Sequence, residues 1–443
     1  MTDAHERRRR AVILVGGPAN PYSRAIRLGR TLAGLGYEVE IAATAEPGAP
    51  AIERDGPLTI HRYGSSGVFR SVKTAARWFP ATDDPARRPP LPVRLVRGLR
   101  RATRQWRTRS LRWLLWPYTV RDWWHTLAAE LEPADLYHSC GALPIAAAIA
   151  ARERDRRAGR RSRVILDVID ISLESNNVLD VPRPILWLLR RRERNWARAA
   201  DAHTAINDAF ADRAMALWRL PRRPTVVPNY PEPWAPASDE PAPDRIRAAL
   251  GLPPSTRICL FWGRLGPNLG LDEMADAVLR VPDAVLVLLG FARGWADSVA
   301  RDEDPRYRGR HFTLPAVHPD ELAAWVASAD VGLITLPPVS FNQRHTTPNK
   351  FLESMMAGTP MVLGPDLPTM AAILEREDLG RIAASMAPAD IAAAIMAILD
   401  RPPTERAEWR ASIAAIARAR YSWPIAAAAY AGLVESLTAG GSA

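Results

Sequence analysis

Lysine is scarce in this chain of 443 residues, whereas arginine is abundant. Lys73 and Lys350 are the only lysines among 59 basic residues, so arginine supplies almost all of the net charge of +11. A strongly basic chain favours anionic partners, such as phosphorylated substrates, acidic membrane surfaces or nucleic acid, but the charge alone does not choose among them. The position of each lysine is therefore informative.

Cysteine is scarce as well, which excludes a fold that depends on disulfide bonds. Cys140 and Cys259, the two cysteines, lie in apolar runs that we predict to be strands, so we expect buried thiols in a reducing cytoplasm. The eight histidines form no close-spaced group with cysteine or carboxylate side chains. We therefore expect chemistry without a metal ion and without a bound cofactor.

Long apolar runs are also missing. The run Ala11–Val15 behind the charged N-terminus is far too short for the core of a signal peptide. The longest aliphatic stretch, Ala142–Ala151, is well below the roughly 20 residues that a membrane-spanning helix needs. The sequence thus predicts a cytoplasmic protein without a transmembrane helix.

The first part of the chain, residues 1–228, alternates between strand and helix patterns. Strand Ala11–Val15, the turn Gly16-Gly17, a helical pattern that ends at Gly36 and strand Tyr37–Ala42 follow one another with short loops, which indicates a parallel sheet. Further strands are predicted at Leu136–His138, Val164–Val168 and Ala202–Ile206. This pattern predicts a doubly wound α/β domain.

A proline-rich linker, residues 229–244, separates this domain from a second one at residues 245–420. The prolines forbid a regular element in the linker, and the alternating pattern restarts after it. Strands of the second domain are predicted at Ile258–Trp262, Ala284–Leu289, His311–Leu314, Val331–Thr335 and Met361–Leu363. The predicted fold class is α/β with two parallel sheets, and a hydrophobic content of 47% can fill both cores.

An insertion at about residues 80–125 is rich in arginine and tryptophan. Its segment Arg94–Trp116 carries eight arginines, with Leu95, Leu99 and Trp106 on one helical face. Two structures fit this pattern: a helix packed on the first domain with a solvated arginine face, and an interfacial helix on an anionic membrane surface. Nucleic-acid binding is not expected, because no recognition-helix or RNA-binding motif accompanies the charge.

The segment Thr346–Gly358 has the pattern of a helix with a defined start and end. Thr347 is the predicted N-cap and Pro348 suits the first helical position. Gly358 can end the helix before the strand Met361–Leu363. The start of this helix would lie at the carboxyl edge of the second sheet.

Lys350 and Glu353 are three residues apart on the open side of this predicted helix. A helix N-terminus offers free N–H groups and a positive dipole end, which suits a diphosphate, and Lys350 adds a charge. Arg264 ends a predicted strand before a glycine-rich turn, where an arginine can hold a phosphate bidentately. The alternative is an ordinary capped helix on which Lys350 and Glu353 form a surface ion pair.

In the order of its motifs the chain resembles glycosyltransferase family 4, retaining enzymes of the GT-B fold. The motifs are Gly16-Gly17, Asp135-Leu136-Tyr137-His138, Val227-Pro228-Asn229, Gly263-Arg264-Leu265, the stretch Glu321–Leu333, and Pro348–Glu353 followed by Ala357–Val362. The resemblance covers nearly the whole chain, and the last block is its most diagnostic part. It implies two Rossmann-like domains that face each other across a cleft, with a C-terminal helix at residues 421–443 that crosses back to the first domain.

The resemblance also implies a donor-binding role for the segment around Lys350. Arg264 and Lys350 would neutralise the donor's diphosphate. Thr347, Pro348 and Asn349 would belong to the donor site, with the backbone from Pro348 to Lys350 binding the diphosphate oxygens. The second glutamate of the family's motif corresponds to Glu353, which would hold the ribose.

On the side of the first domain, the resemblance assigns roles to three residues. Gly16 and Gly17 would let the backbone approach the donor phosphate and sugar. His138 lies near the position where the family has a histidine that contacts the transferred sugar. A core histidine with satisfied hydrogen bonds is the alternative for His138, because the second histidine that many members have corresponds to Cys140.

Two further positions depart from the family's pattern. The family's first glutamate, eight residues before the second, corresponds to His345, so the usual contact to the donor sugar's hydroxyls is missing. The lysine commonly found a few residues after Arg264 corresponds to Leu269, which leaves one phosphate charge to be supplied by another residue. The identity of the sugar is therefore open.

The leading functional hypothesis is a retaining glycosyltransferase that uses a nucleoside-diphosphate sugar and a glycan or lipid-linked acceptor. Cell-surface polysaccharide or glycoconjugate synthesis would be its setting, in the cytoplasm or peripherally at the inner membrane face. The second hypothesis is a non-catalytic binding or assembly protein on the same fold, because His345 and Leu269 replace polar contacts. A UDP-sugar epimerase of similar fold is the third.

Overall fold

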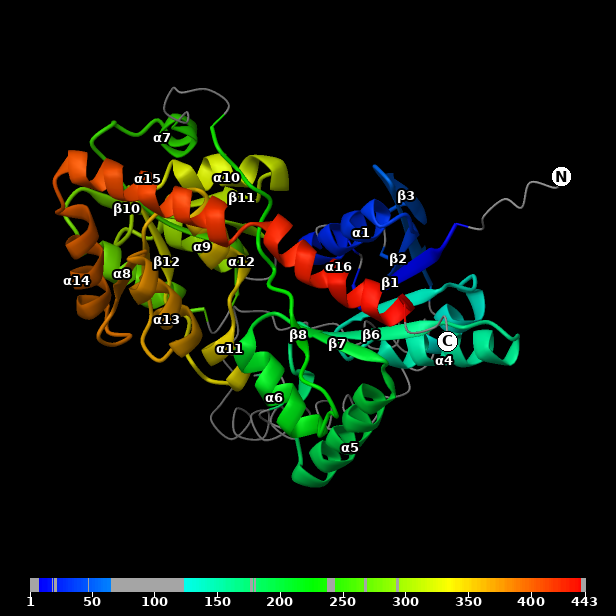
Figure 1. Ribbon diagram of the computed structural model, residues 1–443. Coiled ribbons are helices and arrows are strands. Elements are labelled where there is room, and N and C mark those ends of the chain that lie inside the picture. Colours follow the sequence, from blue (N-terminus) through cyan, green and yellow to red (C-terminus); the bar gives the residue numbers. More distant parts are fainter. Residues whose placement is uncertain are drawn as a thin grey trace, which may run out of the picture.

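The computed structural model describes residues 8–439 except for residues 18, 20–21, 47, 65–122, 176–177, 179–180, 237–243, 267–268 and 292–294. Two α/β domains lie side by side, and the last helix runs from the second domain across to the first (Figure 1). The segment Arg94–Trp116, with its predicted membrane contact, lies outside the described residues. Of the predicted insertion the structure describes only residues 123–125, which begin a helix that extends over residues 123–130.

The first domain is built on an eight-stranded sheet with the order β3-β4-β2-β1-β5-β6-β7-β8. Its strands are β1 (Arg10–Val15), β2 (Glu38–Thr44), β3 (Ile52–Asp55), β4 (Leu58–Tyr63), β5 (Leu136–Cys140), β6 (Arg163–Val168), β7 (Ala202–Ala205) and β8 (Thr225–Val226). Its helices are α1 (Ser23–Gly34), α4 (Ile145–Arg157), the 3-10 helix η1 (Ser172–Glu174), α5 (Arg183–Ala199) and α6 (Asp208–Trp218).

Helices cover both faces of this sheet, so the domain is doubly wound as predicted. On β1, Ala11 and Ile13 face the hydrophobic cluster that contains residues of α1. Val12 and Leu14 face the opposite cluster, which contains residues of α4 and α6. A parallel strand buried on both faces needs apolar side chains in both directions, which is why β1 is an unbroken apolar run. The predicted strands of this domain end within two residues of the observed ones.

The outer edge of this sheet was not predicted from the sequence. Strands β3 and β4 form an antiparallel hairpin around Gly56 and Pro57, and β4 pairs with β2 in parallel. Gly56 has a φ of +56°, which the tight turn requires. Strand β3 carries three charged residues and is largely solvated, so it lacks the apolar run by which the other strands were recognised. The short strands β8 and β14 were missed as well.

The second domain contains a six-stranded sheet with the order β11-β10-β9-β12-β13-β14. Its strands are β9 (Arg257–Arg264), β10 (Ala284–Phe291), β11 (His311–Pro315), β12 (Val331–Ile334), β13 (Met361–Leu363) and β14 (Gly380–Ile382). Its helices are α7 (Arg245–Leu250), α8 (Leu271–Val278), α9 (Trp295–Glu303), α10 (Pro319–Ala327), α11 (Phe341–His345), α12 (Asn349–Met356), α13 (Pro368–Glu377), α14 (Pro388–Leu399) and α15 (Pro403–Arg420).

All neighbouring strands of the second sheet are parallel, and its two faces bury different clusters. Cys259 and Phe261 of β9 face the cluster with α8, α12, α13, α14 and α15. Leu260 and Trp262 face the cluster with α7 and α10. The strand order reverses between β9 and β12, and ligands of open α/β sheets bind outside the carboxyl ends of the strands at such a point. Helix α12 follows the loop that leaves β12.

The two cysteines are buried, and the described helices are not of the membrane-spanning kind. Cys140 and Cys259 are both free and buried, as predicted. None of the helices in the described part of the chain has both the length and the hydropathy that a membrane crossing needs.

Helix α16 (Trp423–Ala439) joins the two domains, as Figure 1 shows. The backbone N–H of Trp423 donates to the Pro231 carbonyl at 2.8 Å, and its indole N–H donates to Thr31 Oγ1 of α1 at 3.2 Å. Tyr430 is fully buried, and its hydroxyl lies 2.9 Å from His138 Nδ1 on β5. Helix α16 is therefore part of the first domain's core, although it follows the second domain in the chain.

Replacing Tyr430 with phenylalanine tests the contribution of this buried bond. We expect Tyr430→Phe to lower the free energy of unfolding by about 1–3 kcal/mol, because Nδ1 of His138 is left buried without a partner. Urea unfolding followed by circular dichroism measures the change. Ser436→Ala, at an exposed position of the same helix, is the control. Equal stability of the two variants would contradict the role assigned to the Tyr430 hydroxyl.

Candidate functional site

Helix α12 starts one residue later than predicted. Pro348 is the N-cap residue with an extended backbone, Asn349 begins the helix, and no side chain caps it. The prediction that Thr347 caps the helix and that Pro348 takes the first helical position is therefore wrong. Thr347 is buried instead, with its Oγ1 3.5 Å from Nδ2 of Asn207 in the first domain. The Phe351 N–H donates to the Pro348 carbonyl at 2.9 Å, and without a cap the N–H groups of Asn349 and Lys350 remain available to a ligand.

The end of α12 agrees with the prediction. Gly358 follows the C-cap residue Ala357 and has a φ of +66°, a conformation that favours glycine. A Cβ atom at Gly358 would also lie 2.6 Å from the carbonyl oxygen of Arg410. Phe351, Leu352, Met355 and Met356 fill the core on the other side of the helix.

Lys350 lies against the second sheet rather than in open solvent. Its Nζ is 3.7 Å from the centre of the Phe261 ring on β9. Burial lowers the pKa of Lys350 to about 7, and the nearby Glu353 carboxylate opposes this shift without cancelling it. The described contacts include no ion pair between Lys350 and Glu353, so the surface-pair alternative does not hold. A bound anion would favour the protonated form of Lys350.

Glu353 is oriented by an aromatic side chain of the same domain. The indole N–H of Trp262 on β9 donates to Glu353 Oε2 at 2.8 Å. Burial raises the pKa of Glu353, whereas the Trp262 bond and the charges of Arg27 and Lys350 lower it. Arg27 belongs to α1, so Glu353 faces the first domain. Within the described structure no residue donates to its other carboxylate oxygen, which is left for a ligand.

Arg264 is the last residue of β9, the strand that also carries Phe261 and Trp262. Its guanidinium is exposed and makes no hydrogen bond or ion pair with a described residue. The end of β9 therefore connects the three predicted residues Lys350, Glu353 and Arg264. Phe261 contacts Lys350, Trp262 contacts Glu353, and Arg264 lies two residues after Trp262. The two cations and the carboxylate lie at the carboxyl edge of the second sheet, as predicted.

Gly16 and Gly17 lie at the carboxyl end of β1, directly before the segment that leads to α1. Gly17 accepts a hydrogen bond from the Thr44 backbone N–H at 2.9 Å. A Cβ atom at Gly16 would lie 2.5 Å from Cδ2 of Leu143, so a larger residue there would require the Leu143 side chain to shift. Its backbone is exposed.

Asn349 links the start of α12 to the first domain. Its side-chain Nδ2 donates to Ser23 Oγ at the start of α1, at 3.3 Å. Its Oδ1 accepts from Nδ2 of Asn229 in the domain linker, at 2.6 Å. Asn229 Oδ1 in turn accepts from the Arg27 guanidinium at 3.0 Å. The first turns of α1 and α12 therefore meet through neutral amide and hydroxyl groups.

The short helix α11 also contacts the first domain. The side-chain amide of Asn342 exchanges two hydrogen bonds with the backbone of Ile171, at 3.1 and 3.3 Å. The ring of Phe341 lies 5.5 Å from that of Phe210 and 5.3 Å from the guanidinium of Arg213, both on α6. These contacts fix α11, which precedes α12, against the first domain.

His345 ends α11 at the position where the family motif has a glutamate. Its carbonyl accepts from Asn207 Nδ2 at 2.9 Å, and its Nδ1 lies 3.3 Å from Thr369 Oγ1. Burial and the positive charges of Arg344 and Arg213 lower the pKa of His345. The imidazole is therefore neutral at neutral pH and cannot replace the negative charge of a glutamate.

His138 lies inside the first domain rather than at its surface. The ring is fully buried between Tyr430 at 2.9 Å and Asp167, whose Oδ2 is 3.7 Å from Nε2. Burial alone would raise the pKa of Asp167, but Arg24 and the hydrogen bonds that Asp167 accepts lower it, so Asp167 is a carboxylate. Nε2 of His138 has no hydrogen-bond partner among the described residues. The buried position contradicts a contact between His138 and the transferred sugar. His138 is a core histidine, but only its Nδ1 is hydrogen-bonded, whereas the alternative drawn from the sequence was a core histidine with satisfied hydrogen bonds.

His138, Cys140 and Asp167 are the one group of described residues whose potential metal ligands all lie within 4.8 Å of one another. Both oxygens of Asp167 already accept hydrogen bonds from Arg24, at 2.6 and 2.7 Å. A metal ion there would lie beside a guanidinium, and burial holds the Cys140 thiol protonated by raising its pKa. These residues do not fit a metal ion, and chemistry without a metal or cofactor stays a prediction.

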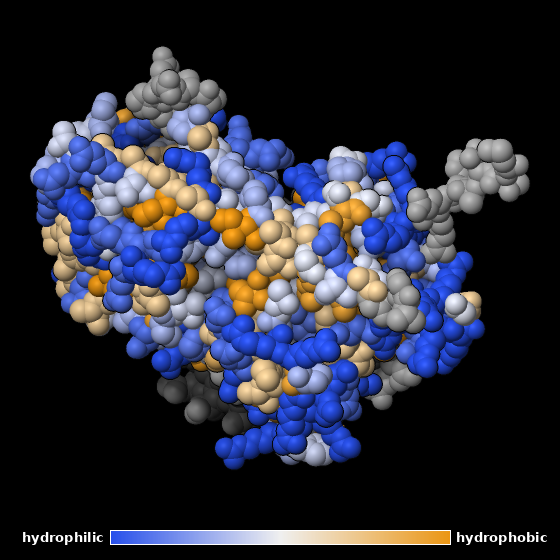
Figure 2. Space-filling model, viewed as in Figure 1, coloured by the Kyte–Doolittle hydropathy of each residue, from blue (hydrophilic) through white to orange (hydrophobic). Residues whose placement is uncertain are grey.

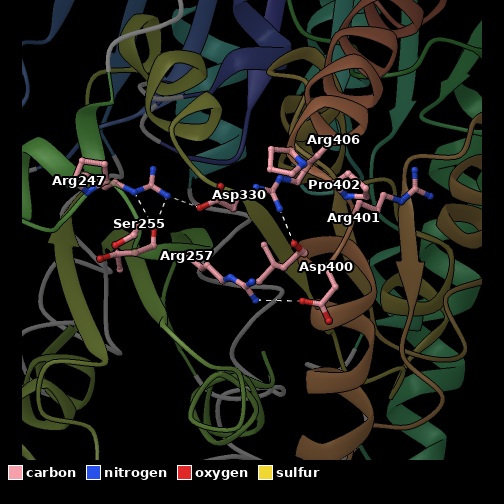
Figure 3. Close-up of a pocket in the computed structure, with 12 residues that line it drawn as sticks. Arg247, Ser255, Arg257, Asp330, Asp400, Arg401, Pro402 and Arg406 are labelled. Carbon is pink, nitrogen blue, oxygen red and sulfur yellow. Dashed lines mark hydrogen bonds and ion pairs between the residues drawn. The ribbon is translucent and has the colours of Figure 1, made fainter.

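A surface depression of about 430 Å³ lies at the opposite edge of the second sheet, near the start of β9 (Figure 3). Arg257 pairs with Asp400 at 3.4 Å, and Arg247 pairs with Asp330 at 2.5 Å. Arg406 donates to the Leu399 carbonyl. The charges here are already paired within the domain, and the amino ends of parallel strands are not where such sheets bind ligands.

Several residues of the site were missed by the sequence analysis. Trp262 orients Glu353, Arg27 lies near the same carboxylate, and Asn207 and Asn342 bridge the domains. Asn207 had a local signal, since it is the N-cap of α6. The other contacts join residues far apart in the chain, so no local pattern identifies them.

The second domain matches a known family. The family described as Glycosyl transferases group 1 matches residues 256–401, about a third of the chain. A D-inositol 3-phosphate glycosyltransferase from Xylanimonas cellulosilytica is 31% identical over 204 residues. That match covers 43% of this chain and 45% of the relative, so the chain matches less than half of the relative's length. Both findings agree with the resemblance stated from the motifs, and assignment to family 4 stays a prediction.

Solved structures resemble the whole chain at low sequence identity. Sucrose-phosphate synthase from Thermosynechococcus elongatus superposes with a TM-score of 0.64 at 16% identity, covering 98% of this chain and all of that one. HepE from Anabaena in complex with UDP-glucose has a TM-score of 0.64 at 13% identity, covering 96% and 99%. Trehalose 6-phosphate synthase from Burkholderia multivorans has a TM-score of 0.60 at 18% identity, covering 98% of both chains. These likenesses confirm the predicted GT-B fold.

The scarcity of lysine makes the pKa of Lys350 directly measurable. In protein with isotope-labelled lysine, the Lys350 resonance is assigned by its loss in Lys350→Arg. We expect it to titrate near pH 7 instead of the usual ~10.4, because burial disfavours the ammonium. In Glu353→Gln the titration should move still lower, since the carboxylate that favours the ammonium is gone. A midpoint above about 9 in the wild-type protein would contradict the buried environment.

Proposed function

We propose that this chain is a retaining glycosyltransferase that moves a sugar from a nucleoside-diphosphate donor to a hydroxyl of a glycan or lipid-linked acceptor. The observation that carries the proposal is the desolvated Lys350 at the uncapped start of α12, beside the end of β9. This region falls within the residues that match the glycosyltransferase family. HepE, which resembles this chain over its whole length, is in complex with UDP-glucose, and this supports a nucleotide-sugar donor.

Catalysis would rest on stabilising the diphosphate as it leaves the anomeric carbon. Negative charge develops on the bridging oxygen as that bond breaks, and preorganised positive groups lower the barrier most. Lys350 would become fully protonated beside the anion, and the free guanidinium of Arg264 would bind it bidentately. The N–H groups at the start of α12 would donate to its oxygens. We assign no protein nucleophile.

The nucleoside would be held by Glu353. With Oε2 occupied by Trp262, the other carboxylate oxygen would accept a hydrogen bond from a ribose hydroxyl. Arg27 of the first domain lies near Glu353 and would add a positive charge on that side of the donor. The contacts of Asn349 with Ser23 and Asn229 would close the domains around the donor and exclude water.

A second candidate function is a non-catalytic protein of glycan assembly. It is favoured by His345, whose neutral ring is turned to Thr369 where a glutamate would bind the sugar hydroxyls. Such a protein would still bind nucleoside diphosphates through Lys350 and Arg264. Cell-surface polysaccharide or glycoconjugate synthesis is the proposed setting of both candidates, with the protein in the cytoplasm or peripheral at the inner membrane face.

Nucleotide binding and sugar transfer test this assignment. We expect Lys350→Ala and Arg264→Ala each to weaken nucleoside-diphosphate binding by about 10- to 100-fold, the loss of one charge-assisted hydrogen bond. Calorimetry with UDP, GDP and dTDP measures it. Arg280→Ala, an exposed arginine after α8, is the matched control. Binding that is unchanged in both site variants would rule out this diphosphate site.

Product analysis with a panel of UDP-, GDP- and dTDP-sugars separates the two candidates. Transfer or hydrolysis of one donor, lost in Lys350→Ala, is the outcome expected of the enzyme. Complete inactivity with intact nucleotide binding would favour the assembly protein.

Trp262→Phe tests how Glu353 is oriented. We expect this variant to lose about tenfold in affinity for the ribonucleoside diphosphate, because the carboxylate is no longer held by the indole N–H. Affinity for the 2′,3′-dideoxy analogue should stay at the wild-type level, since that ligand lacks the hydroxyls that Glu353 would bind. An equal loss for both ligands would point to a general packing defect instead.

A further inference from the structure

Helix α5 presents large apolar side chains to solvent near its start. Trp187 and Leu188 are each 59% exposed. Ile185, Leu186 and Leu189 point the other way, into a small hydrophobic cluster with residues that precede the helix. The helix therefore already buries one apolar face, and Trp187 and Leu188 form a second apolar site that the described residues leave uncovered.

The same exposed side of α5 is lined by arginine. Five arginines of the helix are exposed and form no ion pair with a described residue: Arg183, Arg190, Arg191, Arg192 and Arg198. The one acid of the helix, Glu193, is buried and accepts from the Trp218 indole at 3.1 Å, and burial raises its pKa to about 7. The surface over α5 and α6 is accordingly mostly hydrophilic (Figure 2). This side of α5 carries positive charge without an exposed acid of its own.

Other arginines of the first domain bond to carboxylates or carbonyls of the chain. Arg194, on the inner side of α5, donates to the Leu217 carbonyl at the end of α6. Arg213 of α6 pairs with Glu174 of η1, and Arg223 pairs with Asp208. The exposed arginines of α5 lack such bonds, although the guanidinium of Arg191 lies 5.8 Å from the Trp187 ring and that of Arg192 lies 5.3 Å from the Trp196 ring.

We propose that α5 is a docking surface for an anionic lipid bilayer, with Trp187 and Leu188 entering the headgroup region and the surrounding arginines binding lipid phosphates. Tryptophan prefers the membrane interface because its ring is apolar and its N–H polar. Arginine binds phosphate bidentately and is attracted by the negative surface potential of anionic lipids. An apolar tip within a cluster of unpaired cations is complementary to such a surface.

The position of α5 connects this surface to the domain junction. Helix α5 follows η1, and Ile171, the residue before η1, exchanges two hydrogen bonds with Asn342 of α11. A bilayer bound at α5 would therefore contact the domain that also forms one side of the junction. If the proposed function holds, a lipid-linked acceptor in the same bilayer would be presented near the donor. The docking itself does not depend on that function.

Vesicle binding by the full-length chain tests the proposal. Wild-type protein should co-sediment with vesicles that contain phosphatidylglycerol, and only weakly with phosphatidylcholine alone. The double variant Trp187→Ala/Leu188→Ala should lower the partition coefficient by about tenfold, because it removes the apolar anchor. The triple variant Arg190→Gln/Arg191→Gln/Arg192→Gln should lower it by roughly 100-fold at low salt, since each arginine adds to the attraction.

Matched variants elsewhere on the first domain are the controls. The control Arg156→Gln/Arg157→Gln/Arg160→Gln removes the same charge from exposed positions, two at the end of α4 and one in the loop that follows it. Ile52→Ala removes an apolar side chain that is also 59% exposed. We expect both controls to bind vesicles like the wild-type protein. All exchanged side chains are exposed, and circular dichroism verifies that the variants fold.

Four outcomes would overturn the proposal. In the first two, the wild-type protein fails to bind anionic vesicles, or it binds neutral and anionic vesicles equally. In the third, both α5 variants bind like the wild-type protein. In the fourth, the charge-matched control loses as much binding as the triple arginine variant of α5. A further result would be vesicle binding that is independent of α5, while self-association, or binding of an RNA oligonucleotide, depends on it. That result would mean that the partner of α5 is a protein or RNA and not a lipid bilayer. Nucleoside-diphosphate affinity, measured in parallel, should be unchanged in the α5 variants, which separates this test from that of the donor site.

Discussion

The buried ion pair between Arg24 and Asp167 holds together the edge of the first domain that faces the second. Its two hydrogen bonds measure 2.6 and 2.7 Å, and both side chains are almost completely buried. Arg24 also donates to the Val227 carbonyl at the domain junction, and Asp167 accepts from the Thr204 hydroxyl. Such a pair adds little net stability, but removing one partner costs about 3–5 kcal/mol because the other charge is left uncompensated. It therefore sets where α1, β6, β7 and the junction lie relative to one another.

The contacts between the domains depend on that arrangement. With the start of α1 in place, Ser23 and Arg27 point toward α12, where Asn349 and Glu353 meet them. The direct bonds across the junction are between neutral groups, each worth about 1 kcal/mol, so the domains can separate at modest cost to admit a ligand. Lys350 and Glu353 lie at this boundary, where partial burial shifts their pKa values toward neutrality. A diphosphate would supply the charge that the free protein lacks there.

The abundance of arginine has a structural component as well as an electrostatic one. Several arginines donate to the free carbonyls at the ends of helices: Arg194 to Leu217, Arg310 to Val278, Arg406 to Leu399 and Arg410 to Ala327. A guanidinium suits this role because its planar donors reach two carbonyls and it complements the negative end of the helix dipole. Net charge alone was therefore a poor guide to partners. Arg264 at the end of β9 and the exposed arginines of α5 have no such bonds, and their positions rather than their number suggest which anions they bind.

The amino-acid sequence by itself determined the strands that are buried on both faces, the order of the two parallel sheets along the chain, and the candidate donor residues at β9 and α12. Each of these depends on local apolar runs, on glycine and proline, or on a motif of a few residues. The hairpin β3–β4 was not predicted, because a solvated edge strand such as β3 has no apolar run. Tertiary structure alone decided that His138 is buried against Tyr430, that Trp262 holds Glu353, and that α12 starts at Asn349. These outcomes depend on desolvation and on contacts between distant segments, which exist only once the two sheets and α16 have packed.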